Sequence, residues 1–350
     1  MRRISRIVRI GNVEIGGNNP IAVQSMTKTD TRNVVETVNQ ILELEDAGCE
    51  IIRVAVPDRE AALAIKEIKK GIHIPLIADI HFDPDLAILS IMNGADKIRL
   101  NPSNIRDREQ IVKIANLAKE RGIPIRVGAN LGSFLKKPDN ITEALVSTVL
   151  NEIKILNSVD FDNIVISIKT SDVVQTIKAN ERIAELTDYP IHLGVTEAGP
   201  LEESLIKSSA GIGHLLIKGI GDTLRYSISD MPVKEVEAGF TLLKSLHLRE
   251  RGITIISCPT CGRCEINLFS LIRRVKEDFG HVKTPVKVAI MGCVVNGPGE
   301  AKDAEIGIAG GKKTGVIFKK GKVLKTVSED KLYSEFKKEL EKIIKEKSSS

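Results

Sequence analysis

The segment from residue 51 to residue 80, "IIRVAVPDREAALAIKEIKKGIHIPLIADI", contains one complete β-α-β repeat. Its first six residues and its last five are short apolar runs rich in β-branched side chains, which predicts two buried strands. Between them, residues 59–71 carry apolar side chains at helical spacing and end in glycine, which predicts a helix. Strands that alternate with helices in this way are typical of a parallel sheet.

The same alternation continues along the chain and predicts the fold. Eight units within about 220 residues favour a (β/α)8 TIM barrel over an open doubly wound sheet. No Gly-x-Gly-x-x-Gly fingerprint follows the first strand, which argues against a nucleotide-binding fold. The residues before position 20 are expected to form a hairpin that closes the bottom of the barrel. The expected strands are residues 21–26, 51–56, 76–80, 97–101, 125–130, 163–168, 191–196 and 214–220.

The barrel is expected to end near residue 250, after a helix over residues 233–252. Residues 1–250 are therefore predicted to form the substrate-binding domain, and residues 251–350 a smaller α+β domain. The smaller domain is expected to contain a helix, a strand, a hairpin and a terminal helix. It also contains four of the five cysteines of the chain.

The composition is that of a soluble globular protein, with 42% hydrophobic and 28% charged residues. The net charge of +5 is spread along the chain, aromatic residues make up 3% and tryptophan is absent, so nucleic acid is not an expected partner. No apolar run approaches the roughly 20 residues that span a membrane. Two arginines near the start are not followed by an apolar segment, so no secretory signal is predicted. A cytoplasmic location without membrane contact is the expectation.

Polar and charged side chains occupy the carboxyl ends of the expected strands, where TIM-barrel enzymes have their active sites. A single buried arginine could pair with a neighbouring carboxylate, but several cations on one face predict a shared anionic ligand such as a phosphate or diphosphate. Asp79, His81 and Glu197 are the candidates for proton transfer. The polar residues at these ends are Arg53, Asp79, His81, Arg99, Asn101, Arg126, Asn130, Ser167, Lys169, Thr196, Glu197 and Lys218.

The cysteines predict metal or redox chemistry. Cys258, Cys261 and Cys264 lie within "SCPTCGRCEINLF", residues 257–269, and Cys293 follows in "MGCVVNGPGE". A zinc site usually takes two close pairs of ligands, and Cys293 has no cysteine or histidine two to four residues away. An iron–sulfur cluster accepts Cys-x2-Cys-x2-Cys with a remote fourth cysteine.

One question about the clustered cysteines stays open at this point. The fourth ligand of a cluster is either Cys264 or the carboxylate of Glu300, which follows a turn-forming Asn-Gly-Pro-Gly segment. Spacing alone does not choose between them. Cys49 stands apart from the others and is expected to be a small buried hydrophobic residue.

Six motifs in order then resemble one family. The chain is similar to the bacterial 4-hydroxy-3-methylbut-2-enyl diphosphate synthases of the non-mevalonate isoprenoid pathway, from about residue 4 to its end. The motifs are "VQSMTKTDT", "ADIHFD", "IRLNPSNI", "RVGANLGS", "SCPTCGR" and "GCVVNGPGEA". The resemblance implies a barrel like that of dihydropteroate synthases, followed by an iron–sulfur domain.

The resemblance also implies the activity and the partners. It implies reductive ring opening and dehydration of 2-C-methyl-D-erythritol 2,4-cyclodiphosphate, with two electrons from a ferredoxin or flavodoxin. A [4Fe-4S] cluster would be held by Cys258, Cys261, Cys293 and Glu300, with the Glu300-ligated iron exchangeable. Cys264 departs from the family pattern and would be a bystander. The family acts as a homodimer, in which the barrel of one subunit is capped by the cluster domain of the other.

Carried over to the barrel, the resemblance assigns substrate-binding roles. The residues that would bind the diphosphate are Arg53, Arg99, Asn101, Arg126, Asn130 and Lys169. Asp79 and Glu197 would handle protons or orient the arginines. One rival enzyme is a barrel transferase with a structural zinc site. A zinc-ribbon nucleic-acid module is another class, but it predicts a concentrated basic surface with stacking aromatics, which this sequence lacks.

Overall fold

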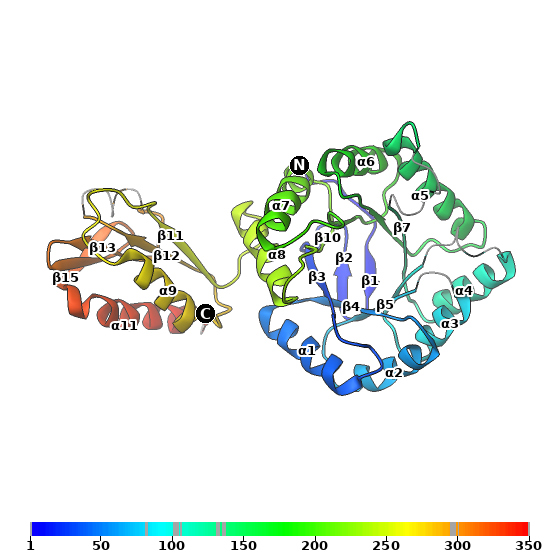
Figure 1. The fold of residues 1–350 in the computed structure, drawn as a ribbon, viewed down its shortest axis with the longest axis horizontal. Helices are drawn as coiled ribbons and strands as arrows, with labels where there is room; N and C mark the ends of the chain where they lie inside the picture. The colour runs from blue at the N-terminus through cyan, green and yellow to red at the C-terminus, as the bar shows by residue number, and fades with distance from the viewer. Residues whose placement is uncertain are drawn as a thin grey trace. The chain divides into compact units, whose positions relative to one another are not determined.

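The computed structural model describes residues 2–80, 83–100, 105, 107–130, 134, 138–294, 299 and 301–348. The chain divides into two compact units, Met1–Arg249 and Glu250–Ser350. The first unit is a barrel, and the second is a smaller mixed sheet covered by helices (Figure 1).

Within the described residues, eight parallel strands form the barrel in the order β8-β7-β6-β5-β4-β3-β10-β9. A bridge between Ile166 and Ile191 joins the two ends of this order, so the sheet closes on itself. The predicted (β/α)8 architecture is confirmed. The strands are β3 (Ala22–Met26), β4 (Ile51–Ala55), β5 (Leu76–Asp79), β6 (Lys97–Arg99), β7 (Ile125–Ala129), β8 (Ile164–Ile168), β9 (His192–Leu193) and β10 (Thr223–Leu224).

Helices surround the barrel strands, as Figure 1 shows. Most of these helices begin at an Asn or Asp whose side chain accepts a hydrogen bond from a backbone N–H of the first turn; Asp58 does so for α2. Such caps fix where each loop from strand to helix ends. Nowhere in the described part of the chain is a helix both long and apolar enough to span a membrane. The helices are α1 (Val34–Ala47), α2 (Arg59–Lys70), α3 (Pro84–Met92), α4 (Arg108–Glu120), α5 (Ile141–Asn157), α6 (Val173–Leu186), α7 (Leu201–Ile217) and α8 (Val233–Ser245).

The predicted amino-terminal hairpin is present and closes one end of the barrel. Strands β1 (Val8–Ile10) and β2 (Val13–Ile15) pair in antiparallel register. Their buried side chains form one apolar cluster with residues near the amino ends of four barrel strands, such as Ile51. The hairpin therefore covers the end of the barrel opposite the predicted active site.

The eighth predicted strand is wrong. Most of residues 214–220 belong to the last turn of α7, and the eighth strand is β10. A glycine lets α7 pack closely, because a Cβ on Gly211 would lie 3.2 Å from Val195 Cγ2. The end of a helix that is packed on several sides has apolar residues at consecutive positions. In sequence, such an apolar run resembles a buried strand. Lys218, predicted at a strand end, is the C-cap residue of α7.

The second unit is a five-stranded sheet with the order β11-β12-β13-β14-β15. The first three strands are parallel, and the last two add an antiparallel hairpin. Buried aromatic side chains of the helices, such as Phe279 and Phe336, pack in its core. The expected α+β character is confirmed. The elements are β11 (Ile253–Ser257), α9 (Leu268–Phe279), β12 (Val286–Met291), β13 (Ile306–Gly311), β14 (Thr314–Lys319), β15 (Lys322–Ser328) and α11 (Glu329–Ser348).

Replacement of Ile10 by alanine tests whether the hairpin is an integral part of the barrel core. Ile10 is fully buried, so Ile10→Ala should lower the free energy of unfolding by about 2–5 kcal/mol. Ile4 is 74% exposed, and Ile4→Ala should change the free energy of unfolding by less than about 0.5 kcal/mol. Denaturant unfolding of both variants makes the comparison. Equally small effects would show that the hairpin is only loosely attached.

Candidate active site and candidate metal centre

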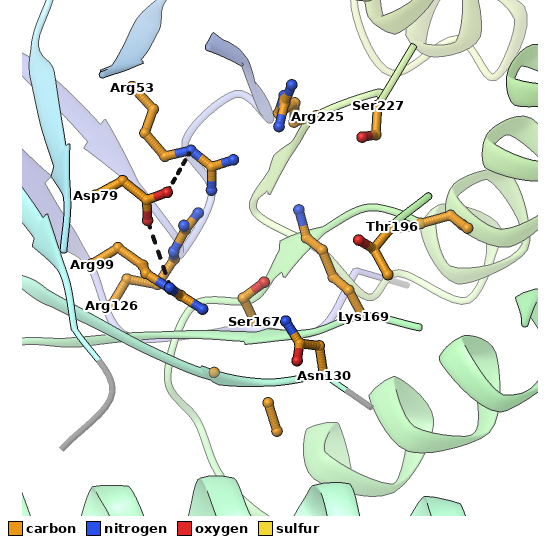
Figure 2. A pocket seen from close by; sticks show the side chains of 13 residues that line it. Arg53, Asp79, Arg99, Arg126, Asn130, Ser167, Lys169, Thr196, Arg225 and Ser227 are labelled. Atoms are coloured by element: carbon orange, nitrogen blue, oxygen red, sulfur yellow. Dashed lines mark ion pairs between the residues drawn. The ribbon is translucent and has the colours of Figure 1, made fainter. Parts of the chain in front are cut away.

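A pocket lies at the carboxyl ends of the barrel strands (Figure 2). Its empty volume is about 700 Å³, part of it open to solvent. Six residues singled out in the sequence for catalysis or substrate binding come together here, although they lie on or directly after five different strands, β4 to β8. The lining residues are Arg53, Asp79, Arg99, Arg126, Gly128, Ala129, Asn130, Ser167, Lys169, Val195, Thr196, Arg225 and Ser227.

Asp79 lies between two of the pocket arginines. Its carboxylate is 3.9 Å from Arg53 Nε and 3.7 Å from Arg99 Nε, and it is buried at the end of β5 (Figure 2). Burial lowers the pKa of Arg53 to about 10, while the charge of Asp79 opposes this shift. Asp79 therefore holds two guanidinium groups in place at the pocket wall.

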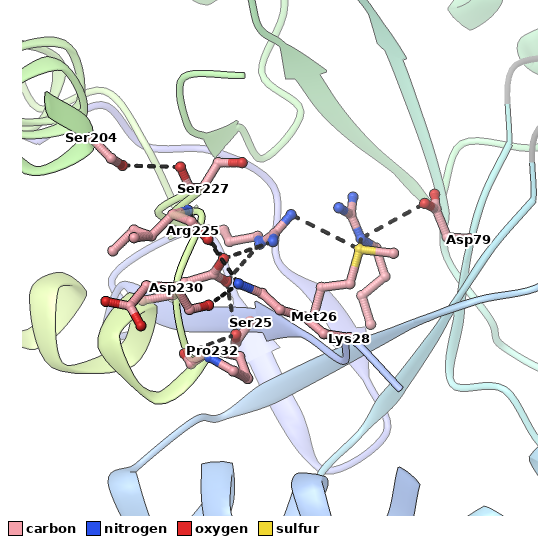
Figure 3. A network of polar contacts seen from close by, with 12 residues as sticks. Ser25, Met26, Lys28, Asp79, Ser204, Arg225, Ser227, Asp230 and Pro232 are labelled. Carbon is pink, nitrogen blue, oxygen red and sulfur yellow. Dashed lines mark hydrogen bonds and ion pairs between the residues drawn. The ribbon is translucent and has the colours of Figure 1, made fainter. Parts of the chain in front are cut away.

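Arg225 is a pocket cation that the sequence analysis missed. Arg225 Nε and Nη2 each donate a hydrogen bond of 2.9 Å to Glu235, which is fully buried in α8. Ser25 Oγ donates to the same carboxylate at 2.9 Å (Figure 3 shows this network). Arg225 lies two residues beyond Thr223, on the same side of the true eighth strand. Correct placement of that strand in the sequence would have pointed to it.

Arg126 and Lys97 are buried without matching acceptors. Among the described residues, Arg126 Nη1 and Lys97 Nζ have no hydrogen-bond partner. Burial lowers the pKa of both groups well below the usual values, and nearby cations lower them further. Lys97 was also missed, although it precedes Arg99 by two residues and shares its side of β6. Of the two, only Arg126 lines the pocket, and a buried donor of this kind is suited to an anionic ligand.

The remaining candidates for the barrel site fall elsewhere. The side chain of Glu197 is exposed, its backbone φ is 52°, and it is not among the lining residues. The structure therefore does not bring Glu197 to the cations. Asn101 and His81 lie outside the described residues, as does Glu300 of the second unit.

Topology brings two of the clustered cysteines to one edge of the second sheet. β11 and β12 are parallel neighbours, with Ser257 opposite Ile290. Cys258 and Cys293 follow these strands and so lie at the same edge. Cys258 Sγ accepts a hydrogen bond of 3.3 Å from the backbone N–H of Gly292.

Gly292 makes room for two sulfur atoms. A Cβ on Gly292 would lie 2.7 Å from Cys264 Sγ and 3.5 Å from Cys258 Sγ. The Cys264 thiol donates to the carbonyl of Ile266 at 3.3 Å, whereas Cys261 is exposed. In the described part of the chain, no three Cys, His, Asp or Glu side chains are arranged to hold a metal ion. The sulfur donors and the N–H···S hydrogen bond nevertheless fit the chemistry of an iron–sulfur site.

Strain and burial distinguish two further positions. Thr260, between Cys258 and Cys261, has a left-handed backbone with φ 68°, which is uncommon for a β-branched residue. Such conformations concentrate at functional sites.

Cys49 is buried, and burial raises the pKa of its thiol to about 12. The expectation that Cys49 is a buried structural residue is confirmed.

The fold and the pocket define a TIM-barrel protein with a pocket rich in cations at its strand ends, followed in the chain by a smaller cysteine-bearing domain. Residues 5–240 match the GcpE TIM-barrel domain, and residues 254–342 match the GcpE protein C-terminal domain. The chain belongs to the GcpE family. The family expected from the motifs is confirmed, and so is the expectation that the chain is an enzyme.

Two relatives share most of the sequence. A protein of Caldanaerobacter subterraneus subsp. tengcongensis is 57% identical over 351 residues, which cover 99% of each chain. A protein of Caldicellulosiruptor saccharolyticus is 53% identical over 347 residues, covering 98% of this chain and all of the relative. Both are named 4-hydroxy-3-methylbut-2-en-1-yl diphosphate synthase (flavodoxin).

Two solved structures are similar in fold to about two thirds of the chain. The dihydropteroate synthase of Stenotrophomonas maltophilia has a TM-score of 0.53 at 14% identity, over 69% of this chain and 98% of its own. The Yersinia pestis enzyme has a TM-score of 0.52 at 13% identity, over 69% and 98% of the two chains. The expected dihydropteroate synthase-like barrel is confirmed.

Replacement of Lys97 by methionine should stabilise the barrel in a pH-dependent way. The folded-state pKa of Lys97 is well below its unfolded value, so the unfolded chain binds more protons between the two values. Wild-type stability therefore rises with pH across that interval. Lys97→Met should be more stable by about 1–3 kcal/mol near neutral pH, and the advantage should shrink towards pH of about 10. Calorimetric melting of Lys97→Met and the wild type at several pH values measures the difference in stability between them. A stability difference that does not change with pH would contradict the argument.

Proposed function

We propose that the chain is a 4-hydroxy-3-methylbut-2-en-1-yl diphosphate synthase. Its substrate would be 2-C-methyl-D-erythritol 2,4-cyclodiphosphate, whose ring is opened and dehydrated with the uptake of two electrons. The observation that carries the proposal is the group of buried cations at the strand ends, of which Arg126 retains a donor that has no acceptor among the described residues. The names of the two relatives support the same reaction.

The pocket side chains are assigned to the diphosphate. Arg126 and Lys169 would bind phosphate oxygens from the floor of the pocket, and Asn101 and Asn130 would add hydrogen bonds. Arg53 and Arg99, oriented by Asp79, would bind from the wall. Opening of the ring leaves negative charge on a phosphate oxygen, which fixed cations stabilise in the transition state.

Proton handling is assigned with less structural support. Asp79 is engaged by two arginines, so we assign it to their orientation. Glu197 would have to act from a position where its side chain is exposed and outside the pocket lining. Its role in proton transfer stays a prediction.

We assign a [4Fe-4S] cluster to Cys258, Cys261, Cys293 and Glu300. When bound, such a cluster supplies electrons one at a time together with a Lewis-acidic iron. The space at Gly292 and its N–H directed at Cys258 Sγ favour a cluster at this edge of the sheet. A flavodoxin is the proposed electron donor, as the names of the relatives suggest. The homodimer and the cytoplasmic location implied by the sequence stay predictions; sedimentation velocity tests the first.

Metal analysis after anaerobic purification separates this function from its rival. About four irons and four sulfides per chain are expected, with an EPR signal after dithionite reduction that changes when the cyclodiphosphate is added. Stoichiometric zinc without labile sulfide would instead support a barrel transferase with a structural zinc site.

Substitution of Glu300 tests the proposed oxygen ligand. Glu300→Ala should keep the iron and sulfide held by the three cysteines but lose most turnover, by on the order of 100-fold. Glu265→Ala is the matched control, because Glu265 is an exposed carboxylate beside Cys264 and has no assigned role. It should keep wild-type turnover. A fully active Glu300→Ala enzyme would remove Glu300 from the mechanism.

A further inference from the structure

His192 is a buried side chain beside the pocket that neither the sequence motifs nor the proposed mechanism uses. It lies on β9, is fully buried, and its Nε2 is 2.9 Å from Lys169 Nζ. Its Nδ1 is 2.8 Å from Thr223 Oγ1 on β10, the residue directly opposite it in the sheet. The contacts therefore form one chain from Thr223 through His192 to Lys169, which lines the pocket (Figure 2).

The chemistry of the three groups fixes the direction of the hydrogen bonds. An ammonium group has three donors and no acceptor, so Lys169 in its charged form must donate to Nε2 of the imidazole. Nδ1 then carries the ring proton and donates to Thr223 Oγ1. Burial and the neighbouring cations lower the pKa of His192 well below its usual value, which keeps the ring neutral and able to accept.

A glycine leaves the space that the amine of Lys169 occupies. A Cβ on Gly194 would lie 2.7 Å from Lys169 Nζ and 2.8 Å from the carbonyl oxygen of Arg225. The amine thus lies close against the backbone that follows β9, with the imidazole as its acceptor. Among the described residues, the imidazole is the one hydrogen-bond partner of the amine, which leaves two of its three N–H donors for a ligand.

The surrounding charges make this acceptor important. Burial lowers the pKa of Lys169 well below its usual value, and the charges of three arginines lower it further. Glu235 is the carboxylate that acts in the other direction, but it is already bound by Arg225. Without the imidazole nitrogen, the amine would lose its proton more readily. The three arginines are Arg126, Arg53 and Arg225.

We propose that His192 is a positioning residue that holds Lys169 as an ammonium group directed at the diphosphate. The inference rests on the proposed function, since it assumes that the pocket binds a diphosphate. It adds a residue that does not touch the ligand and that acts through Lys169. A side chain that only fills the core would have no effect on the proton of Lys169.

Two amide substitutions separate positioning from packing. The amide of asparagine reaches the place of Nδ1, so His192→Asn keeps a contact with Thr223 and removes the acceptor of Lys169. The amide of glutamine reaches the place of Nε2, so His192→Gln can still accept from Lys169. Both variants lose the ring and so share the packing defect.

The measurement is calorimetric binding of inorganic pyrophosphate over a range of pH from about 6 to 10. His192→Asn should bind about tenfold more weakly, the loss expected for one hydrogen bond to a charged group. Its binding should also fail at a lower pH than that of the wild type, because Lys169 has a lower pKa without its acceptor. His192→Gln should stay within about threefold of the wild type and keep its pH profile.

Thr223→Val is a second variant that leaves His192 in place. Valine cannot accept the Nδ1 proton, so the ring should favour the other tautomer, in which Nε2 carries a proton and no longer accepts from Lys169. The pH profile should shift in the same direction as in His192→Asn. This variant keeps the proposal testable if His192→Asn does not fold.

The outcomes separate the inference from the function on which it rests. A wild-type chain that does not bind pyrophosphate would overturn the diphosphate pocket itself, and the role of His192 with it. A wild-type chain that binds, with equal losses in the two amide variants and no change in pH profile, would overturn the role of His192 alone. A shift in His192→Asn and Thr223→Val that His192→Gln does not show supports it.

Discussion

The concentration of cationic side chains at the carboxyl ends of the strands is the constraint on which the rest of the site depends. The guanidinium group of arginine stays protonated near neutral pH, and a buried charge requires a partner. Glu235 provides one for Arg225, and Asp79 is shared by Arg53 and Arg99. Arg126 keeps a donor without an acceptor among the described residues. The proposed diphosphate would supply acceptors for these cations.

Apolar packing at the other end of the barrel makes this polar interior possible. The hairpin of β1 and β2 covers the amino ends of the strands with fully buried residues such as Ile10 and Ile15. Water is excluded from that end, and the polar layer above it opens at the pocket. In this setting a hydrogen bond such as that between Lys169 and His192 is stronger than it would be in water.

The second unit uses parallel strand pairing to gather sulfur atoms. Cys258 and Cys293 are far apart in the sequence, but the register of β11 with β12 places both just beyond the carboxyl ends of these neighbouring strands. Gly292 keeps that edge free of a side chain, so Cys258 and Cys264 can approach. In both units the candidate site residues thus lie at the carboxyl ends of parallel strands.

The sequence by itself determined the barrel, the family and most of the pocket, because strand and helix periodicity is local and parallel strands bring their carboxyl ends together. It misplaced the eighth strand, since an apolar helix end packed around Gly211 looks like a strand. Only the tertiary structure decided which charges are paired. Arg225 with Glu235 and Lys169 with His192 join residues of different elements, and no local pattern specifies such partners.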